Sequence, residues 1–156
     1  MRIEGAKPSR VGCHAMREVI RARGHEHVRA EHASTFEVTT DDWLTPAGDC
    51  IIGVDADRTP ADFDPAFVEA CQSHDATIDV HVRVDAGDDA HEQTVRARGH
   101  PDLTFEGDRS VVFRTSDYVD DRTGAVGAAH AAAGFDRDLV SALVDGAELT
   151  VTIEVE

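Results

Sequence analysis

Lysine is almost absent from this 156-residue sequence: Lys7 is the only one, and the other 14 basic residues are arginine. Acidic residues outnumber basic ones by 31 to 15, which gives a formal net charge of −16. Such a composition is typical of a halophile with a cytoplasm of concentrated potassium chloride, because at about 1 M salt the Debye length is only about 3 Å and self-repulsion is screened. The same charge disfavours nucleic acid as a partner, since phosphate contacts need lysine and arginine.

Aromatic residues, cysteine pairs and long apolar runs are also scarce. One Trp, one Tyr and six Phe offer few platforms for stacking bases, which leaves Arg21, Arg23, Arg96 and Arg98 as the basis of a nucleic-acid-associated alternative. Three cysteines without a CxxC pair predict a reducing compartment. No run approaches the roughly 18 apolar residues of a membrane span, and no signal peptide is visible, so we expect a soluble cytoplasmic protein without a membrane partner.

The sequence does contain a repeat, which begins with RARGH at 21–25 and again at 96–100. Four further blocks follow in the same order in both halves: ASTFEVTT with SVVFRTSD, CIIGVDAD with AVGAAHAA, FDPAFVEAC with FDRDLVSAL, and ATIDVHVRV with ELTVTIEVE. This alignment pairs Phe36 with Phe113 and Gly53 with Gly127. It predicts an internal duplication, with repeat 1 at about 18–84 and repeat 2 at about 93–156. Residues 1–15 are expected to be a flexible extension before a single β-rich domain, 16–156.

The two repeats carry matching local signals. Asp64 followed by Pro65 predicts a helix start, and Asp136 predicts the equivalent cap in the second repeat. Strict alternation at 78–84 and 151–155 predicts strands with one buried face. The alanine-rich segment 125–133 favours helix by propensity, but the repeat favours strand over 125–128. We therefore expect a mainly β to α+β fold: a two-layer sandwich of about eight strands and two short helices, β-β-β-α-β twice, with a pseudo-twofold axis.

Three motifs resemble an uncharacterised archaeal family. They are RGHEHVRAEHASTFEVT, with its TxExT pattern; LTPAGDCIIGVDAD, with GDCIIGV; and FRTSDYVDDRTGAVGA, with DRT. The resemblance covers about 18–155, and the acidic composition points to a haloarchaeal member. What it implies is a β-rich, sandwich-like domain of archaeal origin. It implies no reaction, because the family is a domain of unknown function.

Polar residues found in only one repeat are the first candidates for a site. In the alignment His32, Thr35, Glu37, Thr39, Asp49 and Cys50 stand opposite Arg109, Val112, Arg114, Ser116, Gly124 and Ala125. A catalytic hypothesis collects His32, Glu37, Asp49 and Cys50 into one pocket, as ligands of a divalent metal, as a general acid and base, or as a Cys–His nucleophile pair. The alternatives are a polar row that faces water and a Cys50 that is a small core residue.

A second group of residues predicts ligand binding. Arg114, Ser116 and Arg122 can hold a phosphate or carboxylate, because guanidinium binds such groups in a bidentate fork. Thr35 and Thr39 lie on the same strand face as Glu37, and His25 forms a His-x-His pair that is either structural or a weak metal site. The alternative for the charged residues is an ion pair between Glu37 and Arg114 across the pseudo-axis.

Three functions follow in order of support. The first is a module that binds a small anionic ligand or partner in a polar cleft between the repeats. The second is a hydrolase or transferase, with or without a metal, that uses the four catalytic candidates. The third is a nucleic-acid-associated protein. The sequence assigns no cofactor, metal or oligomeric state, and it leaves open whether the protein is an enzyme.

Overall fold

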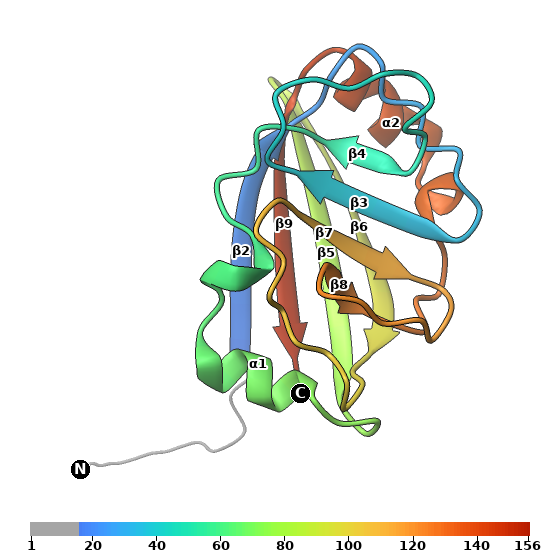
Figure 1. The fold of residues 1–156 in the computed structure, drawn as a ribbon. Helices are drawn as coiled ribbons and strands as arrows, with labels where there is room; N and C mark the ends of the chain where they lie inside the picture. The colour runs from blue at the N-terminus through green and yellow to red at the C-terminus, as the bar shows by residue number, and fades with distance from the viewer. Residues whose placement is uncertain (1–15) are drawn as a thin grey trace.

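The computed structural model describes residues 16–156, and the predicted extension at 1–15 lies outside the described residues. Two four-stranded sheets pack face to face (Figure 1). The first is antiparallel, with the order β2 (Met16–Arg23), β9 (Glu148–Val155), β5 (Thr77–Ala86) and β6 (Asp89–Arg98). The second has the order β4 (Ile51–Gly53), β3 (Thr35–Thr39), β7 (Ser110–Arg114) and β8 (Thr123–Ala125). The mainly β sandwich predicted from the sequence is confirmed.

Two short helices, α1 (Pro65–Cys71) and α2 (Arg137–Val144), lie at opposite ends of the molecule (Figure 1). The carboxylate of Asp64 accepts a hydrogen bond from the backbone N–H of Ala66, and that of Asp136 accepts one from the N–H of Asp138. Both predicted helix caps are therefore confirmed. In the alanine-rich segment the strand ends at Ala125, and a 3₁₀ turn follows at Ala132–Gly134. The strand expected at 125–128 thus begins two residues earlier than predicted, at Thr123, and ends three residues earlier, at Ala125.

The β-β-β-α-β order occurs twice, and the hydrogen bonds repeat with it. Arg23 pairs with Val54 across the two sheets, and Arg98 pairs with Val126 in the same way. Residues of β2 and β3 correspond to residues 75 positions later, in β6 and β7. Residues of β4 correspond to residues 72 positions later, in β8. The shortening falls in the loop before the third strand of each repeat.

This register corrects the sequence alignment at two points. Phe36 is not equivalent to Phe113; instead the two are direct cross-strand neighbours of β3 and β7, and their rings stack at a centroid distance of 4.9 Å in the core. The position equivalent to Phe36 is Val111. Likewise Gly53 corresponds to Ala125 rather than to Gly127, because Val38 pairs with Gly53 as Phe113 pairs with Ala125.

The repeated RARGH marks a close approach of backbones. The N–H of Gly24 donates to the carbonyl of Ala147, and the N–H of Gly99 donates to the carbonyl of Ala76. A Cβ at Gly24 would overlap the carbonyl oxygen of Leu143 in α2, and one at Gly99 would overlap that of Cys71 in α1. Each strand end therefore packs against the helix of the other repeat, and only glycine leaves room for it.

We expect Gly24→Ala and Gly99→Ala each to lower the free energy of unfolding by about 2 kcal/mol or more, because a backbone carbonyl cannot move aside as a side chain can. Urea unfolding in concentrated potassium chloride measures this. Gly48→Ala is the control, since the nearest atoms to its Cβ would be the terminal methyls of Leu44 and Ile51 at 3.0 and 3.3 Å, and the backbone carbonyl of Thr45 lies at an ordinary contact distance of 3.5 Å. Losses no larger than that of the control would contradict the packing described here.

Candidate functional site

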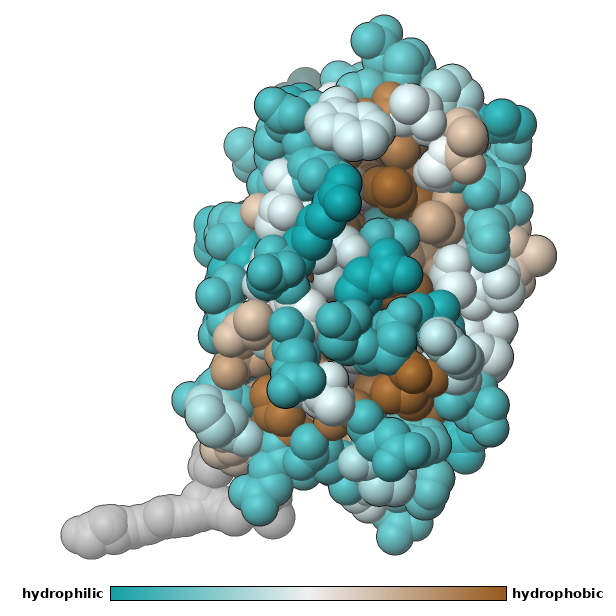
Figure 2. Space-filling model, in the orientation of Figure 1, coloured by the Kyte–Doolittle hydropathy of each residue, from teal (hydrophilic) through white to brown (hydrophobic). Residues whose placement is uncertain are grey.

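The outer face of the β4–β3–β7–β8 sheet carries the polar row that the sequence predicts. Phe36 and Val38 point into the core, so Thr35, Glu37 and Thr39 point to the opposite face. Figure 2 shows this face, where polar residues predominate and apolar surface is visible between them. The row does not lie open to water: Thr39 is 2% exposed, and the side chain of Glu37 is 14% exposed.

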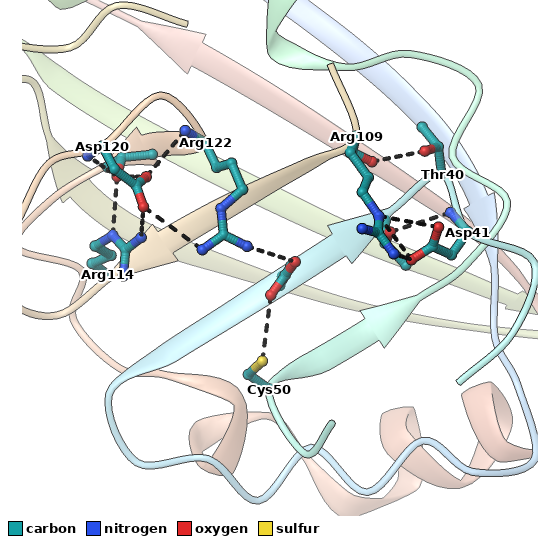
Figure 3. Close-up of polar contacts among 10 residues, drawn as sticks. Thr40, Asp41, Cys50, Arg109, Arg114, Asp120 and Arg122 are labelled. Atoms are coloured by element: carbon teal, nitrogen blue, oxygen red, sulfur yellow. Dashed lines mark hydrogen bonds and ion pairs between the residues drawn. The ribbon is translucent and has the colours of Figure 1, made fainter. Parts of the chain in front are cut away.

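Arg122 lies between two carboxylates on this face (Figure 3). Its guanidinium is 3.7 Å from Glu37 and 3.6 Å from Asp120. Both distances exceed hydrogen-bond length, and within residues 16–156 the Arg122 side chain donates no hydrogen bond. Arg114, by contrast, donates to Asp120 and to the Thr123 hydroxyl, both at 3.0 Å. Arg114 is thus held by two hydrogen bonds, whereas among the described residues the side chain of its neighbour Arg122 keeps its donors free.

The Asp120 carboxylate, which lies beside Arg114 and Arg122, is held in its ionised form. Burial alone would raise its pKa, but the Thr123 hydroxyl, the Arg122 backbone N–H and the Arg114 guanidinium together lower the pKa below its ordinary value. The Arg114 guanidinium also lies 4.9 Å from the centroid of the exposed Tyr118 ring, which is a cation–π distance. Asp120 therefore stays ionised and keeps Arg114 in place.

A hollow of about 320 Å³ opens beside Arg122, between the two repeats. One side is apolar, formed by Trp43, Leu44 and Ile51. The polar side is formed by Glu37, Thr39, Asp41, Arg109, Ser110 and Arg122. The volume is at the lower end of the range for small-molecule sites, which run from about 300 to 1,000 Å³.

The groups around this hollow differ in how well they are paired. Arg109 is engaged, because its guanidinium binds the Asp41 carboxylate through two nitrogens at 2.8 and 3.2 Å (Figure 3). Ser110 is only 3% exposed, yet within residues 16–156 its hydroxyl makes no hydrogen bond. Glu37 accepts one weak bond, from the Cys50 thiol at 3.4 Å. Arg122, Glu37 and Ser110 thus present unused hydrogen-bonding capacity on the same hollow.

The catalytic candidates are brought together only in part. Glu37 and Cys50 are in contact, but no hydrogen bond joins the side chain of His32 or of Asp49 to either of them. The Nδ1 atom of His32 faces the Thr35 N–H at 3.2 Å, inside its own turn. Asp49 is connected to His32 only through the backbone, where its carbonyl accepts the His32 N–H at 3.3 Å.

Cys50 is held as a thiol. Burial, together with the charge and hydrogen bond of Glu37, raises the pKa of Cys50 from 9.0 to about 11. A nucleophilic cysteine needs a lowered pKa. The geometry therefore gives no support to a Cys50–His32 nucleophile pair. Among residues 16–156, moreover, no three His, Cys, Asp or Glu side chains are placed to hold a metal ion together.

The six ligand-binding candidates fall into three pairs. Arg122 and Thr39 line the hollow. Ser116 and His25 each accept the N–H two residues later, of Tyr118 and His27, and so stabilise turns. Thr35 lies on the same outer row, directly opposite Arg114.

The alternative in which Glu37 forms an ion pair with Arg114 is wrong. Glu37 pairs with Arg122, and Arg114 pairs with Asp120. The reason is the register: Val112 lies opposite Glu37 on β7, and Arg114 lies opposite Thr35, two residues along the strand.

Sequence reasoning missed Trp43, Asp41, Arg109 and Ser110. The signal that was available is a single pair of residues: Trp43 and Tyr118 are the only Trp and Tyr of the chain and lie 75 positions apart. Trp43 lies two residues after Asp41, and Tyr118 lies two residues after Ser116, the position equivalent to Asp41. Both aromatic residues are more than half exposed.

The arginines of the nucleic-acid alternative lie apart. Arg21 and Arg23 are on β2, and Arg96 and Arg98 are on β6, at the opposite edge of the same sheet. Arg96 is paired with Asp79 at 3.0 Å. No helix within 16–156 combines the length and the apolar character needed to cross a membrane.

We expect Cys50 in the folded protein to react with iodoacetamide at pH 8 about 10- to 100-fold more slowly than in the unfolded chain, because little thiolate forms below pH 11. Glu37→Gln should lower the pKa of Cys50 and speed the reaction, whereas Asp49→Asn should not. Mass spectrometry of the Cys50 peptide separates it from Cys13 and Cys71. Equal rates in the folded and unfolded chains would contradict this assignment.

Comparison with known proteins is consistent with the resemblance noted in the sequence. An uncharacterized protein of the archaeon Methanocaldococcus jannaschii is 37% identical over 140 residues, which cover 90% of this chain and all of the relative. Residues 20–156 match the family described as a domain of unknown function, DUF371. The match covers β3 to β9 and the second half of β2, and with them every element that forms the hollow. The chain therefore belongs to the DUF371 family.

Proposed function

We propose that this protein binds a small anionic ligand in the hollow on the outer face of the β4–β3–β7–β8 sheet. The observation that carries this proposal is the state of Arg122. Its side chain is 45% exposed, it borders the hollow, and its guanidinium is 3.6 Å or more from both nearby carboxylates. A carboxylate or phosphate in the hollow would take up these free donors in a charge-assisted, bidentate pair.

The apolar residues of the hollow support a ligand with an apolar or flat portion. Trp43 is 56% exposed, which is unusual for the largest aromatic side chain. Exposed Trp with a nearby Arg is typical of binding sites, because the ring offers contact area at a low cost in conformational entropy. Leu44 and Ile51 extend this apolar side.

We further propose that binding takes place in the concentrated salt of a haloarchaeal cytoplasm. The excess of acidic residues and the near absence of lysine support this setting. Surface charges are screened there, so a ligand must be recognised through short-range contacts such as those of Arg122. Nucleic acid has less support as a partner, because the four arginines invoked for it lie at two opposite sheet edges.

Trp43, the only tryptophan, makes intrinsic fluorescence a direct reporter of the hollow. The probes are leucine, 4-methylpentanoate and inorganic phosphate, titrated in concentrated potassium chloride. We expect a saturable change with at least one of them and a loss of affinity of about tenfold or more in Arg122→Ala, because a charge-assisted bond is removed.

Arg96→Ala is the matched control, since it removes the same charge from the outer face of the other sheet. It should leave affinity unchanged. The proposal fails if none of the three probes binds, or if Arg96→Ala weakens binding as much as Arg122→Ala.

A further inference from the structure

We infer that the ligand is a free α-amino acid with an apolar side chain. This inference rests on the proposed function and narrows it: the anionic group that Arg122 binds is the carboxylate of a zwitterion. It comes from Glu37, whose carboxylate borders the same hollow as Arg122 and is largely withdrawn from water. The binding of an anion to Arg122 alone does not account for that carboxylate.

The charges of the hollow explain why a simple anion fits badly. An anion at Arg122 would displace the 3.7 Å contact with Glu37 and leave two negative groups side by side. A ligand that carries an ammonium group next to its carboxylate removes this conflict. Its ammonium donates to Glu37 while its carboxylate accepts from Arg122, so each half of the existing ion pair gains a partner.

Glu37 also has the free capacity that such an ammonium needs. One carboxylate oxygen, Oε1, accepts only the weak thiol bond of Cys50, and the other, Oε2, faces Arg122 beyond hydrogen-bond distance. An ammonium is a compact donor of three hydrogen bonds, which suits a carboxylate with several open acceptor positions.

Ser110 gives an independent indication of a polar ligand. Ser110 lines the hollow and is only 3% exposed, and its hydroxyl has no hydrogen-bond partner among residues 16–156. A buried hydroxyl without a partner is costly, so its presence points to a group that is hydrogen-bonded there when the site is filled. The apolar side formed by Trp43, Leu44 and Ile51 is left for the ligand's side chain.

The test compares three molecules that share one hydrocarbon skeleton: leucine, 4-methylpentanoate, which lacks the amine, and 3-methylbutylamine, which lacks the acid. Trp43 fluorescence reports binding of each to the full chain. We expect leucine to bind at least tenfold more tightly than either analogue. Glu37→Gln should reduce leucine affinity about tenfold without weakening 4-methylpentanoate, and Ser110→Ala should weaken leucine binding severalfold.

Glu31→Gln is the control for the loss of a carboxylate, since Glu31 is exposed and pairs with Arg29 away from the hollow. Equal affinity for leucine and 4-methylpentanoate would overturn the amino-acid assignment and leave the anion site standing. Tight binding of 3-methylbutylamine alone would overturn both, because Arg122 would then have no role. Circular dichroism of each variant shows that the fold is kept before affinities are compared.

Discussion

The fold depends on two places where backbones meet without room for a side chain. Gly24, at the end of β2, lies against the last turn of α2, and Gly99, at the end of β6, lies against the last turn of α1. Next to these contacts, Arg23 with Val54 and Arg98 with Val126 connect the two sheets by backbone pairing. Each strand end is held by the helix of the other repeat, so the two halves form one structure. The same helices cover the strand ends beside these contacts.

This interlocked core leaves the outer face of the β4–β3–β7–β8 sheet free to differ between the repeats. With the register of the structure, Glu37 corresponds to Val112, Thr39 to Arg114, and Cys50 to Arg122. A symmetric sheet thus acquires an asymmetric set of charges: one arginine fixed by Asp120, and a second, Arg122, shared between two carboxylates. One member of each of these pairs, Glu37, Thr39 and Arg122, lines the hollow, so the chemistry of the hollow differs between the repeats while the core is shared.

The regular parts of this structure could be predicted because their signals are periodic. Alternation at 78–84 marks β5, and the Asp64–Pro65 pair marks the start of α1. The alignment failed where chemical identity misled it: Phe36 and Phe113 were paired as equivalents, although they are neighbours that stack across β3 and β7. Trp43 could not be placed, because it lies in an irregular loop, where no period indicates which way a side chain points. The predicted pocket does not join His32 to Glu37, because the His32 ring is held by a hydrogen bond within its own turn.

We propose above all that the hollow beside Trp43 is a binding site made by divergence of two equivalent halves. The most direct measurement is a heteronuclear NMR titration of the isotopically labelled chain with leucine, followed at every assigned backbone amide. Shifts concentrated at Thr39, Ser110 and Arg122, with the amides of β2 and β6 unmoved, are the predicted result. Shifts centred on Tyr118, shifts on the outer face of the β2–β9–β5–β6 sheet, or a spectrum that stays unchanged with leucine, 4-methylpentanoate and inorganic phosphate alike would contradict this conclusion.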